Sequence, residues 1–335
     1  MVNAANRRRG MRDVAAAAGV SVSTVANVLN NPGVVAEPTR RRVEEAMDAI
    51  GFVRSGPARQ LRGLPSRLVG SVTLDQGNPF YAELNRGIED HLDGEDCMLL
   101  ACSTDLRPDK ELRALHLLEE QSPRGVIVTP TGEDGGRFAA VSSRGTPVVL
   151  LDARQDGLDL CAVTVDHDLG GRLAGEHLTA LGHRRVAFIT NGPDIDPVRE
   201  RREGLRRALS ADPIEVRLAP GGFAEGTDAA VGALLSMADP PTAVACVNDV
   251  VALAVIRAMQ ARGLSVPDDL SVVGYDDLPW AAHVRPALTT VQRPIRELGR
   301  VAAELLLSET ATSHRHQELV FPPRLIVRSS TRAVR

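Results

Sequence analysis

The sequence predicts a small all-α module followed by a larger α/β body with two lobes, each built on a parallel sheet. Three observations lead to this expectation. A helical pattern occupies residues 11–50, short apolar runs alternate with amphipathic stretches from Leu68 onward, and the alternation starts again near Val186. Such alternation is typical of βαβ units, in which helices cover both faces of a parallel sheet. A chain of 335 residues has room for about two domains and a small appended module.

The N-terminal module follows the pattern of a helix-turn-helix. Residues Arg12–Ala18 favour a helix that ends at Gly19, a residue suited to a tight turn. Ser21 can cap a second helix over Val22–Asn30, so the connection between the helices is very short. A third helix is predicted after Pro38, because apolar residues recur there at helical spacing. Its apolar stripe consists of Val43, Ala46, Met47 and Ile50.

The second helix and the charge distribution both point to DNA. The polar face of this helix carries Ser23, Thr24 and Asn27, and a DNA major groove admits a helix of this kind. Residues 1–66 contain ten Arg and five Asp or Glu, a net charge of +5, whereas the whole chain carries −4 and the remainder −9. A basic head on an acidic body suits phosphate binding at one end of the protein.

The body alternates strand and helix patterns. Buried strands are predicted at residues 68–74, 97–102, 125–129, 147–151, 186–190, 243–247 and 270–275. Helices are predicted at residues 80–92, 109–121, 138–144, 169–181, 198–209, 225–237 and 250–262. Two such series in succession predict two doubly wound lobes with a cleft.

Composition and cysteine usage suggest the compartment. A hydrophobic content of 43% with 24% charged residues is typical of a soluble globular protein. No apolar run reaches the ~18–20 residues of a membrane span, and no signal peptide is expected. The four cysteines lack paired spacing, which suits a reducing cytoplasm, and we interpret them as buried thiols that pack as small hydrophobes. We therefore expect a cytoplasmic protein without a membrane partner.

Polar side chains follow several predicted strands, where open α/β sheets bind ligands. They are Asp75, Asp152, Asn248, Asp249, Asp276 and Asp277. Such groups can form directional hydrogen bonds with a ligand, but they also commonly cap the next helix or form turns, and both alternatives stay open. Of the nine aromatic residues, Phe80 and Tyr81 follow Asp75, and Phe223 lies in a Gly-rich stretch. Their rings can stack on a ligand or pack between lobes.

Signs of catalysis are weak. The sequence contains no G-x-S-x-G elbow, Walker loop or GxGxxG motif, and we interpret no histidine pair as having metal-ligand spacing. His167, His177 and His183 are interpreted as surface groups or as groups with satisfied hydrogen bonds. We expect no catalytic residues and no metal.

Three segments together resemble the lactose-repressor (LacI/GalR) family of bacterial regulators. They are DVAAAAGVS followed by STV and VLN, then TRRRVEEAMDAIGF, then ARQL. The resemblance covers nearly the whole chain. It implies a headpiece at residues 1–53, a hinge helix and linker at 54–67, and an effector-binding and dimerisation domain at 68–335 with the fold of periplasmic sugar-binding proteins. Lobe one is expected at about 68–165 and 293–320, and lobe two at about 166–292 and 321–335. The helix at 295–307 would return to the first lobe and the last strand, near 325–328, to the second.

The resemblance also implies an effector site. Arg201 in RREGLRRAL matches the family's effector-binding arginine, whose fork of donors can grip a hydroxyl pair or a carboxylate. Asn248 and Asp276 match positions that hydrogen-bond ligand, and NPFYAEL resembles the segment at the cleft mouth. The expected effector-binding residues are Asp75, Phe80, Tyr81, Asp152, Arg201, Phe223, Asn248 and Asp276. No cofactor is implied.

In the headpiece, the resemblance implies base contacts from Val22, Ser23 and Asn27. Many relatives carry Arg where this chain has Asn27, and Asn prefers adenine, so the operator preference is expected to differ. Phosphate contacts are expected from Ser21, Thr24, Thr39 and the run Arg40–Arg42. The expected DNA-binding residues are Arg12, Ser21, Val22, Ser23, Thr24, Asn27, Asn30, Thr39, Ala58, Arg59 and Leu61. Ala36 stands where relatives often place a Ser that caps the third helix.

The segment SGPARQL resembles the family's hinge helix, which folds on operator DNA and inserts a leucine into the minor groove. Leu61 is that leucine here, with Ala58 beside it and Arg59 available to phosphate. The usual Pro-Asn before this helix is replaced by Arg54-Ser55, and a plain flexible linker is the alternative.

Two heads of a homodimer would read a palindromic operator. The chain's end carries no long leucine heptad, which favours a dimer over a tetramer. We therefore expect a sequence-specific transcriptional repressor that a sugar or related metabolite controls allosterically. The alternatives are a sugar-binding protein without regulatory DNA binding and, third, an enzyme.

Overall fold

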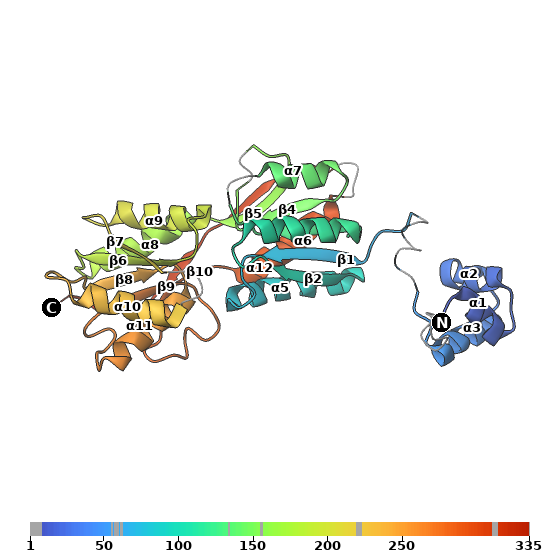
Figure 1. Cartoon of the computed structure of the whole chain (residues 1–335), viewed down its shortest axis with the longest axis horizontal. Coiled ribbons are helices and arrows are strands. Elements are labelled where there is room, and N and C mark those ends of the chain that lie inside the picture. Colours follow the sequence, from blue (N-terminus) through green and yellow to red (C-terminus); the bar gives the residue numbers. More distant parts are fainter. Residues whose placement is uncertain are drawn as a thin grey trace. The chain divides into compact units, whose positions relative to one another are not determined.

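The computed structural model of the chain describes residues 9–54, 56, 60, 63–132, 135–154, 157–218, 223–309 and 314–334, with only the backbone at 223–225 (Figure 1). The chain divides into two compact units, Met1–Pro65 and Ser66–Arg335.

The first unit is a three-helix module. Its elements are α1 (Met11–Ala18), α2 (Val22–Asn30), a 3₁₀ turn η2 (Pro32–Val34) and α3 (Glu37–Ile50). Val14, Val25 and Val43, one from each α-helix, are fully buried in its core. The predicted stripe on α3 is confirmed, because Val43 and Ala46 are buried and Met47 and Ile50 pack against the same core.

The ends of these helices follow the sequence. Gly19 ends α1 in the left-handed region at φ 62°, and the Ser21 hydroxyl accepts a hydrogen bond from the Thr24 backbone N–H at 3.1 Å. Ala36 precedes α3 without a side-chain cap, as its chemistry dictates. Glu37 at the start of α3 places a carboxylate where the helix dipole favours one, which partly offsets the missing cap.

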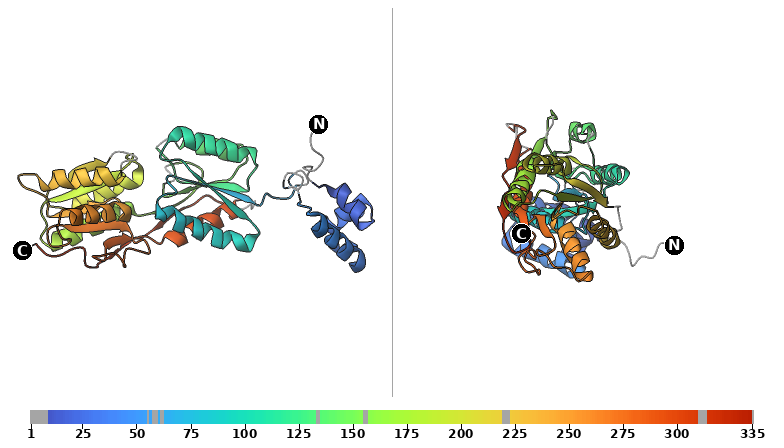
Figure 2. Two further views of the ribbon diagram at one scale, coloured as in Figure 1. Left: turned by 60° about the horizontal axis from the view of Figure 1, so that its bottom comes forward. Right: turned by 90° about the vertical axis from the view of Figure 1, so that its left-hand side faces the viewer.

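The second unit contains two sheets, each with helices on both faces (Figures 1 and 2). The first sheet has the order β11-β5-β4-β3-β1-β2 and is entirely parallel. Its strands are β1 (Leu68–Thr73), β2 (Met98–Ser103), β3 (Gly125–Val128), β4 (Val148–Leu151), β5 (Cys161–Val165) and β11 (Glu318–Phe321). Helices α5 (Pro79–Leu92) and α12 (Ile295–Ser308) cover one face, and α6 (Pro108–Glu120) and α7 (Gly136–Ser143) the other. A short turn, η3 (Asp93–Glu95), follows α5.

The second sheet has the order β12-β10-β9-β8-β6-β7, with only β12 antiparallel to its neighbour. Its strands are β6 (Val186–Asn191), β7 (Ile214–Leu218), β8 (Ala243–Cys246), β9 (Ser271–Asp276), β10 (Thr289–Gln292) and β12 (Arg324–Ile326). The helices of this lobe are α8 (His167–Ala180), α9 (Asp196–Ala208), α10 (Phe223–Leu235) and α11 (Asp249–Ala261). Helices α8 and α9 pack together, as do α10 and α11.

The chain passes between the two sheets three times. It leaves the first sheet after β5, returns after β10 to form α12 and β11, and ends with β12 in the second sheet. The expected return of the 295–307 helix to the first lobe and of the last strand to the second is therefore confirmed. In Figure 1, α12 and β11 carry the red of the C-terminal region among the blue and green elements of the first lobe.

Glycines allow the closest helix contacts in both lobes. A Cβ atom added at Gly87 of α5 would meet the carbonyl oxygen of Arg296 in α12. The same holds in the second lobe between α8 and α9, where a Cβ at Gly204 would meet the carbonyl oxygen of Asp168. The two helix pairs thus pack backbone against backbone, which only glycine permits.

Two expectations about the strands were wrong. The run at 97–102 was predicted to be buried, but β2 is an edge strand, and Met98 and Leu100 are exposed by 66% and 43%. An apolar run shows only that a strand can be buried. A strand at the edge of a sheet has a neighbouring strand on one side only, so its side chains can stay exposed. The sequence interpretation also missed β5, β7, β10 and β11, which are only four or five residues long. Within the described ranges, no helix combines the length and the apolar character needed to cross a bilayer.

Candidate functional site

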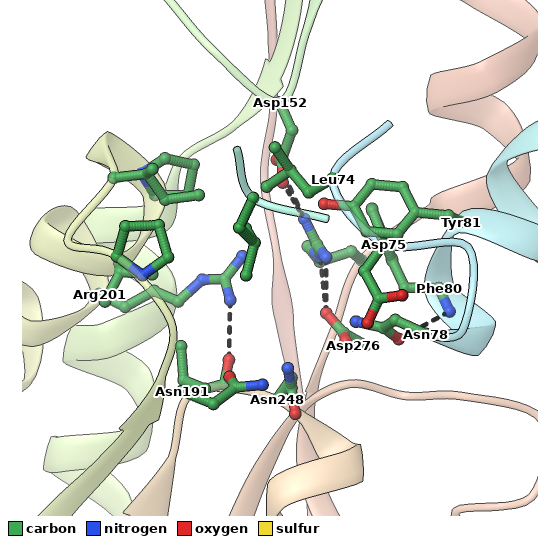
Figure 3. Close-up of a pocket in the computed structure, with 17 residues that line it drawn as sticks. Leu74, Asp75, Asn78, Phe80, Tyr81, Asp152, Asn191, Arg201, Asn248 and Asp276 are labelled. Carbon is green, nitrogen blue, oxygen red and sulfur yellow. Dashed lines mark hydrogen bonds and ion pairs between the residues drawn. The ribbon is translucent and has the colours of Figure 1, made fainter. Parts of the chain in front are cut away.

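A cavity lies at the carboxyl ends of strands from both sheets of the second unit (Figure 3). Seven of the eight predicted effector residues line it: Asp75, Phe80, Tyr81, Asp152, Arg201, Asn248 and Asp276. The eighth, Phe223, begins α10, but its side chain lies outside the described residues. Residues that were not predicted complete the lining: Leu74, Asn78, Leu106, Asn191, Pro193, Ile195, Pro197, Val198, Val247 and Arg293.

Arg293, just after β10, lies at the centre of the charged network. Its Nη1 donates to both carboxylate oxygens of Asp152 at 3.0 and 2.9 Å, and its Nε and Nη2 donate to Oδ1 of Asp276 at 3.0 and 2.6 Å. The guanidinium also lies 3.7 Å from the ring centre of Phe80. Arg293 therefore joins Asp152, which follows β4 in the first lobe, to Asp276, which ends β9 in the second.

Arg201 belongs to a second part of the same network. From α9, its Nη1 donates to the carbonyl oxygen of Val247 at 2.7 Å and its Nε to Nδ1 of His167 at 3.2 Å. Its guanidinium lies 3.9 Å from the ring centre of Tyr275, whose hydroxyl is 3.1 Å from the same His167 nitrogen. The other nitrogen of His167, Nε2, lies 2.8 Å from Asp152. In Figure 3, Arg201 extends into the cavity opposite Phe80 and Tyr81.

The network fixes the proton positions. Because Asp152 can only accept, His167 donates from Nε2, and its Nδ1 is left to accept from Arg201 or Tyr275. Burial lowers the pKa of His167 to about 4, so the ring is neutral at pH 7. Burial opposes the charge of Asp152, but Arg293 and His167 outweigh it and hold the pKa of that carboxyl well below its usual range. For Asp276 burial prevails over Arg293 and raises the pKa.

We expect His167 to make stability depend on pH. Its pKa falls from 6.5 to about 4 on folding, so the unfolded chain takes up a proton first as the pH drops. The free energy of unfolding is therefore unaffected by the titration of this group above pH 6.5. It falls by about 3 kcal/mol as the pH drops from 6.5 toward 4. Urea unfolding of wild-type protein and His167→Gln at pH 7.5 and 5 measures this. The wild-type protein should lose more stability than the variant, and equal losses would remove His167 as the cause.

Two predicted residues line the cavity and also accept hydrogen bonds from backbone N–H groups nearby in the chain. The Asn248 side chain caps α11 by accepting from the Val251 N–H at 2.9 Å, and Asp75 accepts from the Gly77 N–H at 2.8 Å. The alternative of capping or turn formation at strand ends is therefore realised at both positions, without removing either residue from the cavity wall.

The backbone at the acidic positions is unusual. Asp152, Asp276 and Asp277 have φ angles of 54°, 124° and 56°, a region that L side chains rarely adopt. Such conformations persist only where the surroundings impose them, and they cluster at functional sites. Here they direct two carboxylates onto one guanidinium.

In the first unit, the predicted base-contacting residues lie on one exposed helix. Val22, Ser23 and Asn27 are exposed on α2, whereas Val25 and Val28 of the same helix are buried. Arg12, Ser21 and Asn30 are also exposed, and Thr24 and Thr39 are half-buried. Ala58, Arg59 and Leu61 lie outside the described residues.

Some predicted phosphate contacts have partners within the protein. Arg40 and Arg41 form ion pairs with Glu37, although Arg41 stays largely exposed. Exposed pairs of this kind contribute little to stability, so breaking one to contact a phosphate would cost little. Arg54 donates to the carbonyl oxygen of Leu29 and to the side chain of Asn30, contacts that were not predicted. They tie the chain after α3 to the end of α2.

The comparisons with known proteins agree with this geometry. Residues 10–55 match the model described as bacterial regulatory proteins, lacI family, and residues 176–331 match a periplasmic binding protein-like domain. The HTH-type transcriptional repressor PurR of Aliivibrio salmonicida is 33% identical over 329 residues, covering 96% of this chain and 98% of that protein. This chain is a member of the lacI family.

Other relatives of this LacI-family chain agree. The HTH-type transcriptional regulator DegA of Bacillus subtilis is 34% identical over 95% of this chain and 97% of its own length. The crystal structure of the lac repressor dimer bound to operator and the anti-inducer ONPF matches with a TM-score of 0.83 and 27% identity, covering 98% of this chain and 100% of that one. LacI-family repressors are DNA-binding transcriptional regulators with sugar or metabolite effector domains, and they bind operator DNA as dimers. The chain is therefore a DNA-binding transcriptional regulator.

Proposed function

We propose that this LacI-family regulator represses transcription from a palindromic operator as a homodimer, and that a sugar or related metabolite in the cavity controls it. The observation that carries the proposal is a cavity with paired polar groups from both lobes, in a chain that also exposes the polar face of a recognition helix. In this scheme residues 1–53 bind DNA, 54–67 act as the hinge, and 68–335 bind effector and pair the subunits.

The cavity chemistry favours a ligand rich in hydroxyl or N–H groups. Oδ2 of Asp276 is buried without a hydrogen-bond partner among the described residues, so a donor from a ligand would satisfy it. Arg201 uses Nε and Nη1 for protein contacts, and no described residue accepts from its Nη2. Asn191 and Asn248 face the same space in Figure 3 and add amide groups that can donate and accept. Polyols offer both kinds of partner.

Effector control follows from where these contacts lie. His167 and Arg293 lie beside the segments that pass between the lobes, and Asp152 contacts both from the first lobe. A ligand that binds one relative orientation of the lobes more tightly shifts the population toward it, by no more than its difference in affinity. In a dimer that shift would change the separation of the two hinges and hence operator affinity.

Exposed apolar side chains in the first lobe support a dimer. Met98 and Leu100 on β2, and Leu112 and Leu117 on α6, are among the exposed large hydrophobic residues. A second subunit would remove such surface from water. We also propose that the protein acts in the cytoplasm. We further propose that it binds its effector without transforming it, since Arg293 already engages both carboxylates of the cavity, Asp152 and Asp276.

Selection of genomic fragments by the purified protein, followed by sequencing, tests the proposal. We expect one palindromic motif, bound with an affinity that falls steeply as salt rises. The Asn27→Ala variant should lose roughly 1–3 kcal/mol of discrimination at one base pair of each half-site. Arg185→Ala serves as the control, because Arg185 lies in the second unit and pairs with Asp239. Retention of fragments without sequence preference would contradict the proposal of an operator-specific repressor and would favour the alternative, a small-molecule binding protein.

Arg201→Ala should abolish the response to effector while the dimer still binds operator. Loss of hydrogen bonds from a charged donor is expected to weaken effector binding roughly 10- to 100-fold. A thermal-shift screen of sugars and purines on wild-type protein identifies the ligand, and titration of the variants then measures the loss. Arg202→Ala is the matched control, because Arg202 pairs with Asp194 instead of lining the cavity. A normal response in Arg201→Ala would remove Arg201 from the site.

A further inference from the structure

Four side chains with metal-binding chemistry meet in the first lobe, at the edge of the sheet opposite the effector cavity. They are Cys161, Glu309, His314 and His316, and their ligand atoms all lie within 4.8 Å of one another. Cys161 begins β5, Glu309 directly follows α12, and the two histidines precede β11. Because β5 and β11 are parallel, this is the amino-terminal edge of the sheet, whereas the cavity lies at the carboxyl ends.

Three of the six distances among the four ligand atoms are close to those of tetrahedral coordination, and all six are at most 4.8 Å. Metal–ligand bonds of about 2.0–2.3 Å at tetrahedral angles place neighbouring ligand atoms roughly 3.3–3.6 Å apart. Sγ of Cys161 lies 3.2 Å from Nε2 of His314 and 3.7 Å from Nδ1 of His316. The same His316 nitrogen lies 3.7 Å from Oε1 of Glu309.

The local backbone explains why these side chains converge. His314 and His316 are two residues apart, so in an extended segment both side chains project to the same side. The Ala162 N–H donates to the carbonyl oxygen of Gln317 at 3.0 Å, which holds this segment beside the start of β5. We interpreted no histidine pair as having metal-ligand spacing, and sequence spacing does not show that Cys161 and Glu309, from distant parts of the chain, lie beside His314 and His316.

The outer ring nitrogen of His314 has a hydrogen-bond partner as well, because its Nδ1 lies 3.2 Å from the Ser308 hydroxyl. Metal-binding histidines are commonly oriented in this way, since a partner on one nitrogen leaves the other free to coordinate. The outer nitrogen of His316, Nε2, lies 3.9 Å from a carboxylate oxygen of the exposed Asp159, which is longer than a hydrogen bond.

Glu309 provides independent support. Its side chain is only 6% exposed, and Oε1 is buried without a hydrogen-bond partner among the described residues. A buried carboxylate oxygen that lacks a partner is costly, and a cation held by all four groups would satisfy it.

We propose that Cys161, Glu309, His314 and His316 form a four-ligand site for a divalent transition metal, with Zn²⁺ the best match. One sulfur, two imidazoles and one carboxylate suit Zn²⁺, whereas Mg²⁺ and Ca²⁺ take oxygen ligands. All four positions come from the protein, which is the pattern of a structural site. The metal would hold the end of α12 and the edge strand β11 against β5.

Cobalt substitution in the full-length, reduced and chelator-treated protein tests the site. We expect one equivalent of Co²⁺ to give the strong visible absorption of tetrahedral cobalt with a thiolate charge-transfer band, and Zn²⁺ to displace it. His314→Ala and His316→Ala should each weaken binding by more than the roughly 10- to 100-fold typical of losing an outer partner. His116→Ala is the matched control, since His116 is exposed on α6 and pairs with Glu120.

Thermal unfolding provides a second readout. Zn²⁺ should raise the midpoint temperature of unfolding of the wild-type protein and of His116→Ala. It should leave the midpoint temperatures of His314→Ala and His316→Ala unchanged. Cys161→Ser, if it folds, should lose the charge-transfer band. Absence of a tetrahedral cobalt spectrum, or its persistence in both histidine variants, would overturn the proposal.

Discussion

Arg293→Met is expected to lower the free energy of unfolding by about 3–5 kcal/mol, because it leaves two buried carboxylates without their cation. Arg293 is 5% exposed, and Asp152 and Asp276 are 7% and 1% exposed. Met fills much of the same volume, so the loss of stability would come from removing the charge and not from creating a cavity. Urea unfolding at pH 7.5, with the midpoint and slope fitted separately, measures it.

A rescue experiment separates this cause from general damage. Adding Asp152→Asn and Asp276→Asn to Arg293→Met removes the stranded charges, so the triple variant should be more stable than Arg293→Met alone. Arg296→Met is the matched control, because its pair with Glu83 is exposed and should change stability by less than about 1 kcal/mol. A triple variant less stable than Arg293→Met would contradict the electrostatic explanation.

Gly204→Ala is expected to cost about 3 kcal/mol or more. The new methyl group would meet the backbone carbonyl of Asp168, and neither helix can yield as a flexible side chain could. Since α9 also carries Arg201, separating α8 from α9 should weaken effector binding as well. Thermal unfolding and effector titration of one preparation measure both effects.

Gly226→Ala is the control for Gly204→Ala. A Cβ at Gly226 in α10 meets nothing within 4 Å, and alanine favours a helix over glycine. This variant should be as stable as the wild-type protein or slightly more stable. Equal stability of Gly204→Ala and Gly226→Ala would refute the close helix contact.

Much of the site could be predicted because its residues follow strands that the sequence reveals. Asp152 and Asn248 come directly after apolar runs, and the carboxyl ends of parallel strands meet at one edge of a sheet. Arg201 came from a resemblance to a family motif, since helical periodicity alone marks it as one polar residue among several.

Arg293 could not be predicted in this way. It follows β10, a four-residue strand with no distinctive pattern, and its two partners lie 141 and 17 residues away in the chain. His167 was interpreted as a surface or satisfied group. It is satisfied, but by Asp152, Tyr275 and Arg201, which only the folded chain brings together. Likewise, the exposure of β2 depends on its place at the edge of the sheet.

The position of Arg293 has an electrical consequence for the effector. Arg293 accompanies Asp276 in the second lobe, where its backbone N–H bonds the Asp276 carbonyl oxygen, whereas Asp152 approaches from the first. Rotation that separates the lobes would therefore remove one negative charge from a buried cation. An anionic effector could replace that charge and favour separated lobes, while a neutral sugar would leave Asp152 bound. If the effector binds in this cavity as proposed, we expect the sign of its charge to decide which arrangement of the lobes it stabilises.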